Sequence, residues 1–310
     1  MEENTIFEEL SSLVTESRNP NTYDVDVMST KEIIQLINEE DKKVAFAVEK
    51  EILYIEKAVD LITSVFKKGG RLFYIGAGTS GRLGVLDAAE CPPTFGIDQD
   101  MVQGIIAGGY GALVKAVEGA EDFKKNGVTD IEKYGITKND AVCGIAASRR
   151  TPYVIGAIEE AKKIGAKTIM IICNPRDQLT VEVDVAICPI VGPEIIMGST
   201  RMKSATAQKM VLNMLTTTSM IKLGKVYENM MIDLQQNNLK LIERSKKIIM
   251  MASKISYKEA EFILAKSKGH VKSAILMALT NLNLDDVKSL LKKNEGFIKK
   301  AYLEWKNSTK

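Results

Sequence analysis

Residues 71–81 read Arg-Leu-Phe-Tyr-Ile-Gly-Ala-Gly-Thr-Ser-Gly, an apolar run that passes directly into glycines and hydroxyl side chains. The first five residues are bulky and mostly apolar, which predicts a buried strand. Gly76 and Gly78 allow a sharp turn and a close approach of the backbone to a ligand. Thr79 and Ser80 then fall where a helix begins, and the free N–H groups of a helix N-terminus favour an anion such as phosphate. The segment therefore predicts a strand–loop–helix unit that binds a phosphorylated ligand.

The same glycines match the G-x-G-x-x-G pattern of dinucleotide-binding folds, but the surrounding sequence argues against such a site. The pattern needs an acidic residue at the end of the next strand, where it binds the ribose. The next predicted strand, 102–107, is followed by glycines, and Pro92 and Pro93 are expected to cut the intervening helix short. A nicotinamide or flavin site is therefore not favoured.

Apolar strands and helices alternate from residue 71 to about residue 193, which predicts a doubly wound parallel sheet flanked by helices on both faces. The predicted strands are 71–75, 102–107, 141–146, 168–172 and 184–188. The predicted helices are 80–90, 111–118, 151–164 and 203–223. Ligands bind such sheets at the carboxyl ends of the strands.

Other patterns flank this α/β region. Residues 1–28 are polar and are expected to form an extended N-terminal arm. Apolar residues at helical spacing from Ser29 to about residue 67 predict one or two long helices with a capping start. From about residue 227 onward only helices are predicted, at 228–252, 258–265, 271–278, 283–292 and 295–304. We therefore expect an arm at 1–28, an α/β domain at 29–225, and a small all-helical C-terminal domain or lid at 226–310.

Composition narrows the class of protein. The 310 residues carry a net charge of only +2, which gives no electrostatic signature of nucleic-acid binding. The acidic N-terminus lacks the apolar core of a signal peptide, and no apolar run approaches the roughly 20 residues of a membrane helix. The four cysteines show no C-x-x-C spacing and are expected to be small buried hydrophobes of a reducing compartment. The expected location is the cytoplasm.

A single histidine limits the possible chemistry. His270 follows a glycine in a polar segment and is expected in a surface turn. Ser-His-Asp catalysis and multi-histidine metal sites are therefore nearly excluded. If the protein is an enzyme, its proton transfers are expected to depend on carboxylates, lysine or tyrosine.

Two further strand-to-helix junctions carry hydroxyl groups. The third strand leads to Ser148 and Thr151, with Pro152 at the expected first position of the next helix. The fifth strand leads to Ser199 and Thr200 before another helix. Because the carboxyl ends of parallel strands share one edge of the sheet, these junctions and the glycine loop are expected to converge on one anionic ligand.

Two carboxylates lie near these loops. Glu90 is followed by Cys-Pro-Pro, a rigid exit that would fix its position, and Glu121 follows the helix predicted after the second strand. Spacing alone does not favour Glu121 over Glu118.

The loops and carboxylates together resemble the N-acetylmuramic acid 6-phosphate etherases, a family of the sugar isomerase (SIS) domain group. The resemblance covers nearly the whole chain. It is most specific in the segments that begin at Glu90 and at Gly198. The matching segments are Gly76-Ala-Gly-Thr-Ser-Gly-Arg-Leu-Gly84, Glu90-Cys-Pro-Pro-Thr94, Ser148-Arg-Arg-Thr-Pro-Tyr153, Gly198-Ser-Thr-Arg-Met-Lys203, Thr206-Ala-Gln-Lys209 and Thr15-Glu-Ser-Arg-Asn-Pro20.

The resemblance implies an SIS-type fold and a cytoplasmic homodimer that needs no metal or cofactor. It implies cleavage of the ether between D-lactate and C3 of the amino sugar, with Glu121 as the base and Glu90 as the proton donor in an apolar setting that raises its pKa. A basic residue of a partner chain's helical tail, Lys272, is implied to close the site. The loops and the resemblance together assign phosphate and substrate binding to Gly78, Thr79, Ser80, Ser148, Thr151, Ser199 and Thr200.

Two alternatives stay open at this point. Arg149 stands where the family usually has glycine, and Ser204-Ala205 replaces a pair that usually ends in glycine. A large cation in the phosphate loop keeps a non-catalytic sugar-phosphate sensor of the same fold in consideration. An aldose–ketose sugar-phosphate isomerase is the other alternative, although a second carboxylate at Glu90 favours elimination over isomerisation.

Overall fold

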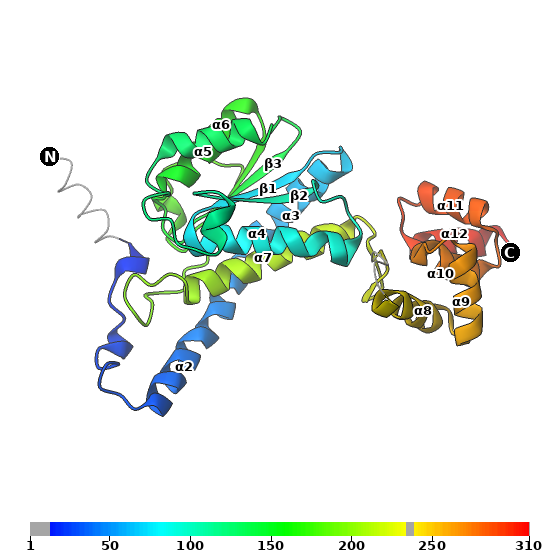
Figure 1. Cartoon of the computed structure of the whole chain (residues 1–310), viewed down its shortest axis with the longest axis horizontal. Helices are drawn as coiled ribbons and strands as arrows, with labels where there is room; N and C mark the ends of the chain where they lie inside the picture. Colours follow the sequence, from blue (N-terminus) through cyan, green and yellow to red (C-terminus); the bar gives the residue numbers. More distant parts are fainter. Residues whose placement is uncertain (1–12, 234–238, 310) are drawn as a thin grey trace. The chain divides into compact units, whose positions relative to one another are not determined.

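The computed structural model describes residues 13–233 and 239–309. A five-stranded, fully parallel sheet forms its centre, in the order β2-β1-β3-β4-β5 (Figure 1). The strands are β1 (Leu72–Gly76), β2 (Val102–Ile106), β3 (Ala141–Ile145), β4 (Lys167–Ile171) and β5 (Val185–Ile187). All five predicted strands are confirmed, and each strand end lies within one residue of its predicted position. Each strand is rich in apolar residues because a parallel sheet is covered on both faces.

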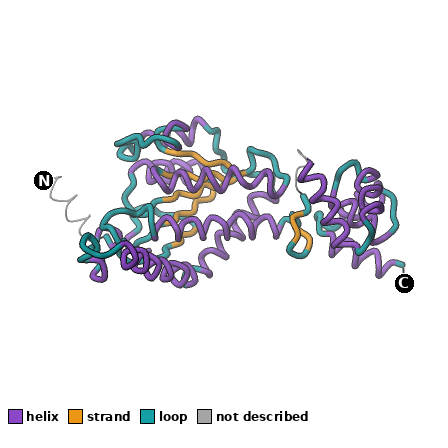
Figure 2. The backbone as a smooth tube through the Cα atoms, turned by 60° about the horizontal axis from the view of Figure 1, so that its bottom comes forward, coloured by secondary structure: helices purple, strands orange, loops and turns teal. Residues whose placement is uncertain are grey.

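Helices cover both faces of the sheet, which confirms the doubly wound fold (Figures 1 and 2). One face carries α5 (Lys124–Lys133) and α6 (Pro152–Ile164), and its core joins Phe73 and Val142 to Ile158. The other face carries α3 (Ile52–Lys67), α4 (Gly78–Phe95) and α7 (Lys203–Lys222). There α4 packs so closely on β1 that a Cβ atom at Gly84 would lie 2.8 Å from the Cβ of Tyr74.

The helices predicted between Ser29 and about residue 67 are confirmed, but the extended arm predicted before them is not. Helix α2 (Thr30–Glu49) begins with a capping box between Ser29 and Glu32. The segment 13–28 forms two 3-10 turns, Val14–Glu16 and Pro20–Thr22, instead of an extended arm. Its side chains Leu13, Thr15, Asn19 and Thr22 are buried against the α/β core. Residues 1–12 lie outside the described residues.

The helix predicted at 111–118 is wrong. A short 3-10 turn, Tyr110–Leu113, stands there, and the chain then runs irregularly to α5, a helix that is absent from the predicted elements. Helix α5 is mostly polar, so its sequence lacks the helical spacing of apolar residues that would predict a helix. It forms because glycine lets it pack tightly on α6, where a Cβ at Gly127 would lie 2.0 Å from the Tyr153 carbonyl oxygen.

The expected helix end before Pro92 is also wrong, since α4 continues through both prolines to Phe95. Proline fixes φ close to the helical value, and what it removes is one N–H donor per residue. The last turn persists, and the Gly96 N–H group bonds to the Pro92 carbonyl at 2.9 Å.

The described residues form two compact units, one made of 13–89 with 100–216, the other of 90–99 with 217–233 and 239–309. The second unit is not all helical as predicted. A small antiparallel hairpin, β6 (Val226–Tyr227) and β7 (Met230–Met231), occupies the start of the helix expected at 228–252. Five helices follow, namely α8 (Leu239–Ser253), α9 (Tyr257–Lys266), α10 (Val271–Thr280), α11 (Leu284–Lys293) and α12 (Ile298–Ser308). Residues 234–238 of that predicted helix lie outside the described residues, and the three-domain division stays a prediction.

The expected burial of the cysteines and the expected surface position of His270 are confirmed. All four cysteines are buried and none forms a disulfide, and burial raises the pKa of the Cys173 thiol to about 12 and that of Cys188 to about 11. His270 is exposed at the start of α10, where its Nδ1 accepts a hydrogen bond from the Ser273 N–H group at 3.3 Å. Within the described chain, no helix combines the length and apolar character required to cross a membrane.

Candidate functional site

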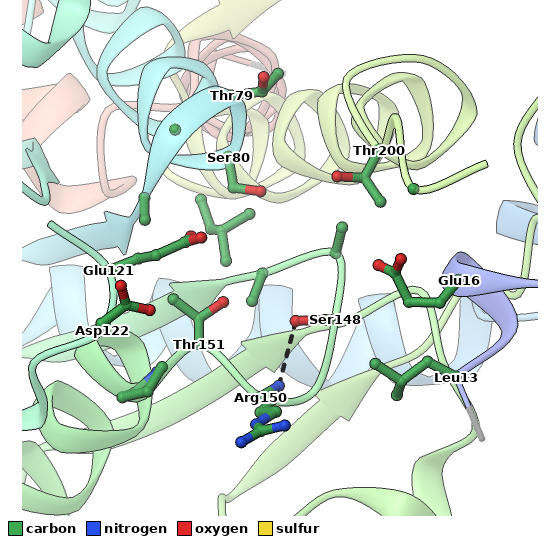
Figure 3. A pocket seen from close by; sticks show the side chains of 17 residues that line it. Leu13, Glu16, Thr79, Ser80, Glu121, Asp122, Ser148, Arg150, Thr151 and Thr200 are labelled. Atoms are coloured by element: carbon green, nitrogen blue, oxygen red, sulfur yellow. Dashed lines mark hydrogen bonds between the residues drawn. The ribbon is translucent and has the colours of Figure 1, made fainter. Parts of the chain in front are cut away.

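A cavity of about 610 Å³ opens at the carboxyl ends of β1 and β3 (Figure 3). These strands are neighbours at the centre of the sheet, where the strand order reverses and where open α/β folds bind their ligands. The cavity is lined by Leu13, Glu16, Ala77, Gly78, Thr79, Ser80, Glu121, Asp122, Ile145, Ala146, Ala147, Ser148, Arg150, Thr151, Pro152, Gly198 and Thr200. The three predicted strand-to-helix junctions thus meet in one place.

The first junction brings two hydroxyls to the start of α4. A Cβ at Gly81 would lie 2.6 Å from the Gly76 carbonyl oxygen, so only glycine lets the helix begin this close to the strand. Thr79 and Ser80 then fall in the first turn, where N–H groups lack helical partners. The Ser80 hydroxyl donates to Oε1 of the buried Gln208 at 2.8 Å. Ser80 is therefore held in place by α7.

The second junction brings Ser148 and Thr151 to the start of α6. Ser148 Oγ accepts a hydrogen bond from the Arg150 N–H group at 3.3 Å, which shapes the loop (Figure 3). Pro152 occupies the first turn of α6, as predicted, and Thr151 makes no side-chain capping bond. The hydroxyl groups of Ser80, Ser148, Thr151 and Thr200 point toward the middle of the cavity in Figure 3.

Buried charged side chains stabilise the third junction. Glu194, which is fully buried, accepts hydrogen bonds from the Lys203 and Ser204 N–H groups at 3.0 and 2.9 Å. The Lys203 ammonium, with a side chain 1% exposed, pairs with Glu40 of α2 at 2.7 Å. Gly198 and Thr200 reach the cavity from this support, whereas Ser199 between them is half-buried and outside the lining formed by the described residues.

Replacing Glu40 with glutamine is expected to lower the free energy of unfolding by about 3–5 kcal/mol, because it leaves the buried Lys203 charge without its counter-ion. Urea unfolding followed by circular dichroism measures this. Glu39→Gln is the matched control, since its pair with Lys42 is exposed on both sides and is worth at most about 1 kcal/mol. An effect no larger for Glu40→Gln than for the control would contradict the argument.

The Glu40 contribution also depends on pH. Burial opposes ionisation, but hydrogen bonds from Lys203 and Lys43 outweigh it and lower the pKa of Glu40 to about 2. A lowered folded-state pKa stabilises the protein above the unfolded-state pKa and ceases to do so as the pH falls toward 2. The stability difference between wild type and Glu40→Gln is therefore expected to shrink over that acidic range.

Glu121 projects into the cavity from the irregular segment before α5 (Figure 3). Its main-chain carbonyl accepts a hydrogen bond from the Tyr153 N–H group at 3.0 Å, and the buried Tyr153 hydroxyl donates to Asp130 at 2.5 Å. The Glu121 side chain is solvent-accessible, yet the cavity wall displaces part of its hydration. This burial raises the pKa of Glu121, and the negative charges of Asp122 and Glu118 raise it further. The raised pKa makes the carboxylate a stronger base than an ordinary surface glutamate.

Leu13, Glu16, Asp122 and Arg150 also line the cavity and were not predicted as site residues. A signal for Glu16 was present, because the segment that resembles the etherases starts at Thr15. The polar character of the segment concealed it, since its buried residues are three polar side chains, Thr15, Asn19 and Thr22, and one apolar side chain, Leu13. Gln208, which supports Ser80, lies likewise within the resembling segment at 206–209.

The two remaining predicted residues belong to the second unit. Glu90 lies on α4 with an exposed side chain, so the described chain does not supply the apolar surroundings expected for it. Lys272 is buried at the start of α10 and pairs with Asp233 at 3.0 Å, as Lys225 does at 3.2 Å. The structure leaves the roles of Glu90 and Lys272 as predictions.

Arg149 does not line the large cavity. Its guanidinium donates to the Gln178 carbonyl at 3.1 Å and borders a separate, smaller cavity of about 240 Å³. Among the described residues, the Arg149 side chain therefore does not stand in the cavity that the phosphate loop lines.

Comparison with known proteins agrees with this geometry. Residues 54–162 match the model of the glucokinase regulatory protein N-terminal SIS domain, and residues 113–218 match the model of the SIS domain. An N-acetylmuramic acid 6-phosphate etherase of Salinibacter ruber is 51% identical over 298 residues, which cover 96% of each chain.

Two further relatives with the same name are similar along nearly their whole length. The etherase of Clostridioides difficile is 56% identical over 94% of this chain and 96% of its own. That of Clostridium botulinum is 55% identical over 95% of this chain and 98% of its own. With identity of this extent, and with an SIS fold whose loops enclose Glu121 and a cluster of hydroxyl groups, the chain belongs to the N-acetylmuramic acid 6-phosphate etherase family.

Proposed function

We propose that the protein cleaves the D-lactyl ether of N-acetylmuramic acid 6-phosphate and releases N-acetylglucosamine 6-phosphate and D-lactate, in the catabolism or recycling of cell-wall amino sugars. The observation that carries the proposal is the placement of Glu121, with its raised pKa, in one cavity with the hydroxyls of the strand-to-helix junctions. Membership of the etherase family supports the same reaction.

The phosphate fits the hydroxyl-lined side of the cavity. Ser80, Ser148 and Thr151 supply hydroxyl donors there, and Gly78, Thr79 and Thr200 line the same cavity as further binding residues in the proposal. Ser199, which lies outside the described lining, is kept as a proposed binding residue because of the family resemblance. The starts of α4 and α6 add N–H groups and partial positive charge. The phosphate is remote from the reacting bonds, so its binding energy serves to orient the sugar.

The reaction is an elimination followed by addition of water. In the open-chain sugar, C2 is next to the C1 aldehyde, which makes the C2 proton acidic enough for a carboxylate base. Glu121 removes this proton, the C3–O bond breaks, and the departing lactate oxygen receives a proton from Glu90. Water then adds to C3 of the unsaturated aldehyde, and a proton returns to C2. Lactate thus keeps the ether oxygen, and the new hydroxyl oxygen comes from water.

This bond accounting gives a direct test of the proposed function. Turnover in ¹⁸O-labelled water is expected to place the label at O3 of N-acetylglucosamine 6-phosphate and none in lactate, as read by mass spectrometry. Label in the lactate instead would exclude cleavage of the C3–O bond. Absence of both products would exclude the etherase reaction itself.

The alternatives have less support. A non-catalytic sensor is favoured only by the match to the glucokinase regulatory domain model, and it gives no role to the base-like Glu121. An isomerase would use the same C2 proton abstraction but would need no acid for a leaving group, and Glu90 would then have no function. Both readings predict that no lactate is formed.

The assembly and setting are part of the proposal. The cysteines are buried and form no disulfide among the described residues, which suits a reducing compartment, and we place the reaction in the cytoplasm. We propose a homodimer that needs no cofactor, in which Lys272 of the partner subunit closes the site. The substrate is the sugar phosphate alone, without nucleic acid or membrane.

Replacing Gln208 with leucine is expected to raise the KM for the sugar phosphate by about 3–10-fold, the effect of one neutral hydrogen bond. Gln208 is buried, and its Nε2 has no partner among the described residues. A half-turn of the amide would let Nε2 donate to Ser80 Oγ and direct the serine proton at the phosphate. Initial rates against substrate concentration measure KM. In a Ser80→Ala background the same replacement should add little, and an equal effect in both backgrounds would contradict the coupling.

A further inference from the structure

The N-terminal segment from residue 13 to residue 22 is part of the cavity wall. Long-range hydrogen bonds fix it to loops that are distant in sequence. The Val14 N–H group donates to Asn174 Oδ1 at 3.0 Å, Asn19 Nδ2 donates to the Pro193 carbonyl at 3.2 Å, and the Thr22 hydroxyl donates to the Ile195 carbonyl at 2.9 Å. The backbone that carries Glu16 is thus held between these anchors.

Glu16 directs an unused carboxylate toward this cavity. Its half-buried side chain lines the cavity and points to the space between Ser148 and Thr200 (Figure 3). No side chain or backbone group among the described residues bonds to the carboxylate. A Cβ at Gly198 would lie 3.1 Å from Glu16 Oε2, and Gly198 has a φ of +76°, so a glycine there makes room for the carboxylate.

A carboxylate at this position can bind only certain parts of the substrate. Glu121 and Asp122 already bring negative charge to the same cavity, and Glu16 would repel both the phosphate and the lactyl carboxylate of the substrate. The parts of the substrate that a carboxylate binds are uncharged donors, because an ionised carboxyl group only accepts hydrogen bonds. The sugar chain offers such donors in its hydroxyl groups.

We propose that Glu16 accepts hydrogen bonds from the hydroxyl groups of the amino sugar and so selects a sugar phosphate over phosphate itself and over phosphate esters without hydroxyls. This inference rests on the proposed function for the identity of the sugar. The reacting C2 proton is assigned to Glu121, so Glu16 acts in binding and its loss affects KM more than kcat.

The first test compares Glu16→Ala and Glu16→Gln with wild type in steady-state lactate release. Loss of hydrogen bonds to a charged acceptor is expected to raise KM by about 10–100-fold in Glu16→Ala. Glu16→Gln keeps one oxygen acceptor and should fall between the two. Glu132→Gln, an exposed glutamate of α5, is the matched control and should behave as wild type. Unchanged KM values for both Glu16 variants would overturn the proposal.

A second test does not depend on turnover. Calorimetric titration with N-acetylglucosamine 6-phosphate and with inorganic phosphate measures each affinity for wild type and Glu16→Ala. The proposal predicts a loss of about 10-fold or more for the sugar phosphate and none for inorganic phosphate. Equal losses for both ligands would show a structural role and would overturn it. If wild type binds the sugar phosphate selectively but releases no lactate, the proposed reaction fails while this binding test still decides the role of Glu16. Thermal melting confirms that each variant is folded, with Glu16→Gln as the milder substitution.

Discussion

Glu121→Gln is expected to abolish lactate release, with a loss in kcat of about 10²–10⁴-fold or more, the usual contribution of a general base. Glutamine retains the size of the side chain but cannot accept the C2 proton. The hydrogen bond from the Tyr153 N–H group goes to the main-chain carbonyl of residue 121, which the substitution does not change. The geometry of the segment is therefore expected to persist.

Two measurements separate this role from a structural one. Proton exchange at C2 in deuterated water, followed by NMR, should disappear in Glu121→Gln together with lactate release. Glu118→Gln is the matched control, because Glu118 is a neighbouring exposed glutamate that does not line the large cavity and should retain turnover. Full lactate release by Glu121→Gln would remove it from the mechanism.

The pH profile gives the same assignment a second test. The raised pKa of Glu121 means that the free enzyme holds its base protonated, and inactive, to a higher pH than an ordinary glutamate would. The acid limb of kcat/KM is therefore expected above the usual glutamate pKa of about 4.3. Asp122→Asn removes one of the like charges and should move this limb to lower pH. A limb that does not move would mean that another group sets it.

Glu90→Gln is expected to reduce lactate release by about 10²–10⁴-fold while C2 proton exchange continues, because an acid protonates the leaving group only after or during cleavage of the C3–O bond. Substitution of the two catalytic glutamates should thus have different effects. Glu121→Gln is expected to lose both C2 proton exchange and lactate release, whereas Glu90→Gln is expected to lose lactate release alone.

The same NMR and lactate assays on Glu90→Gln decide this prediction. Glu90→Asp, which keeps an ionisable carboxyl on a shorter side chain, should recover part of the release. Equal loss of exchange and release in Glu90→Gln would assign Glu90 to an earlier step or to the structure of the site. Unimpaired release would exclude it as the proton donor.

The sheet and the converging loops could be predicted because their causes are local. Each strand is a short apolar run, and each hydroxyl-bearing loop follows a strand end, so parallel topology alone brings Ser80, Ser148 and Thr200 to one cavity. The capping box at Ser29 is local in the same way.

The residues that were not predicted owe their places to tertiary contacts. Glu16 reaches the cavity only because Asn19 and Thr22 bond to backbone groups more than 170 positions away. Helix α5 depends on Gly127 fitting against α6, which composition cannot reveal. The choice of Glu121 over Glu118 came from the family resemblance, since the two lie three positions apart on an irregular segment.

The most direct test of the etherase assignment is incubation of the purified wild-type protein with N-acetylmuramic acid 6-phosphate and enzymatic assay of D-lactate, with Glu121→Gln run beside it. The expected result is D-lactate and N-acetylglucosamine 6-phosphate in equal amounts from wild type and neither from the variant. Tight binding of the substrate by wild type without any lactate would contradict the etherase reaction and favour the sensor.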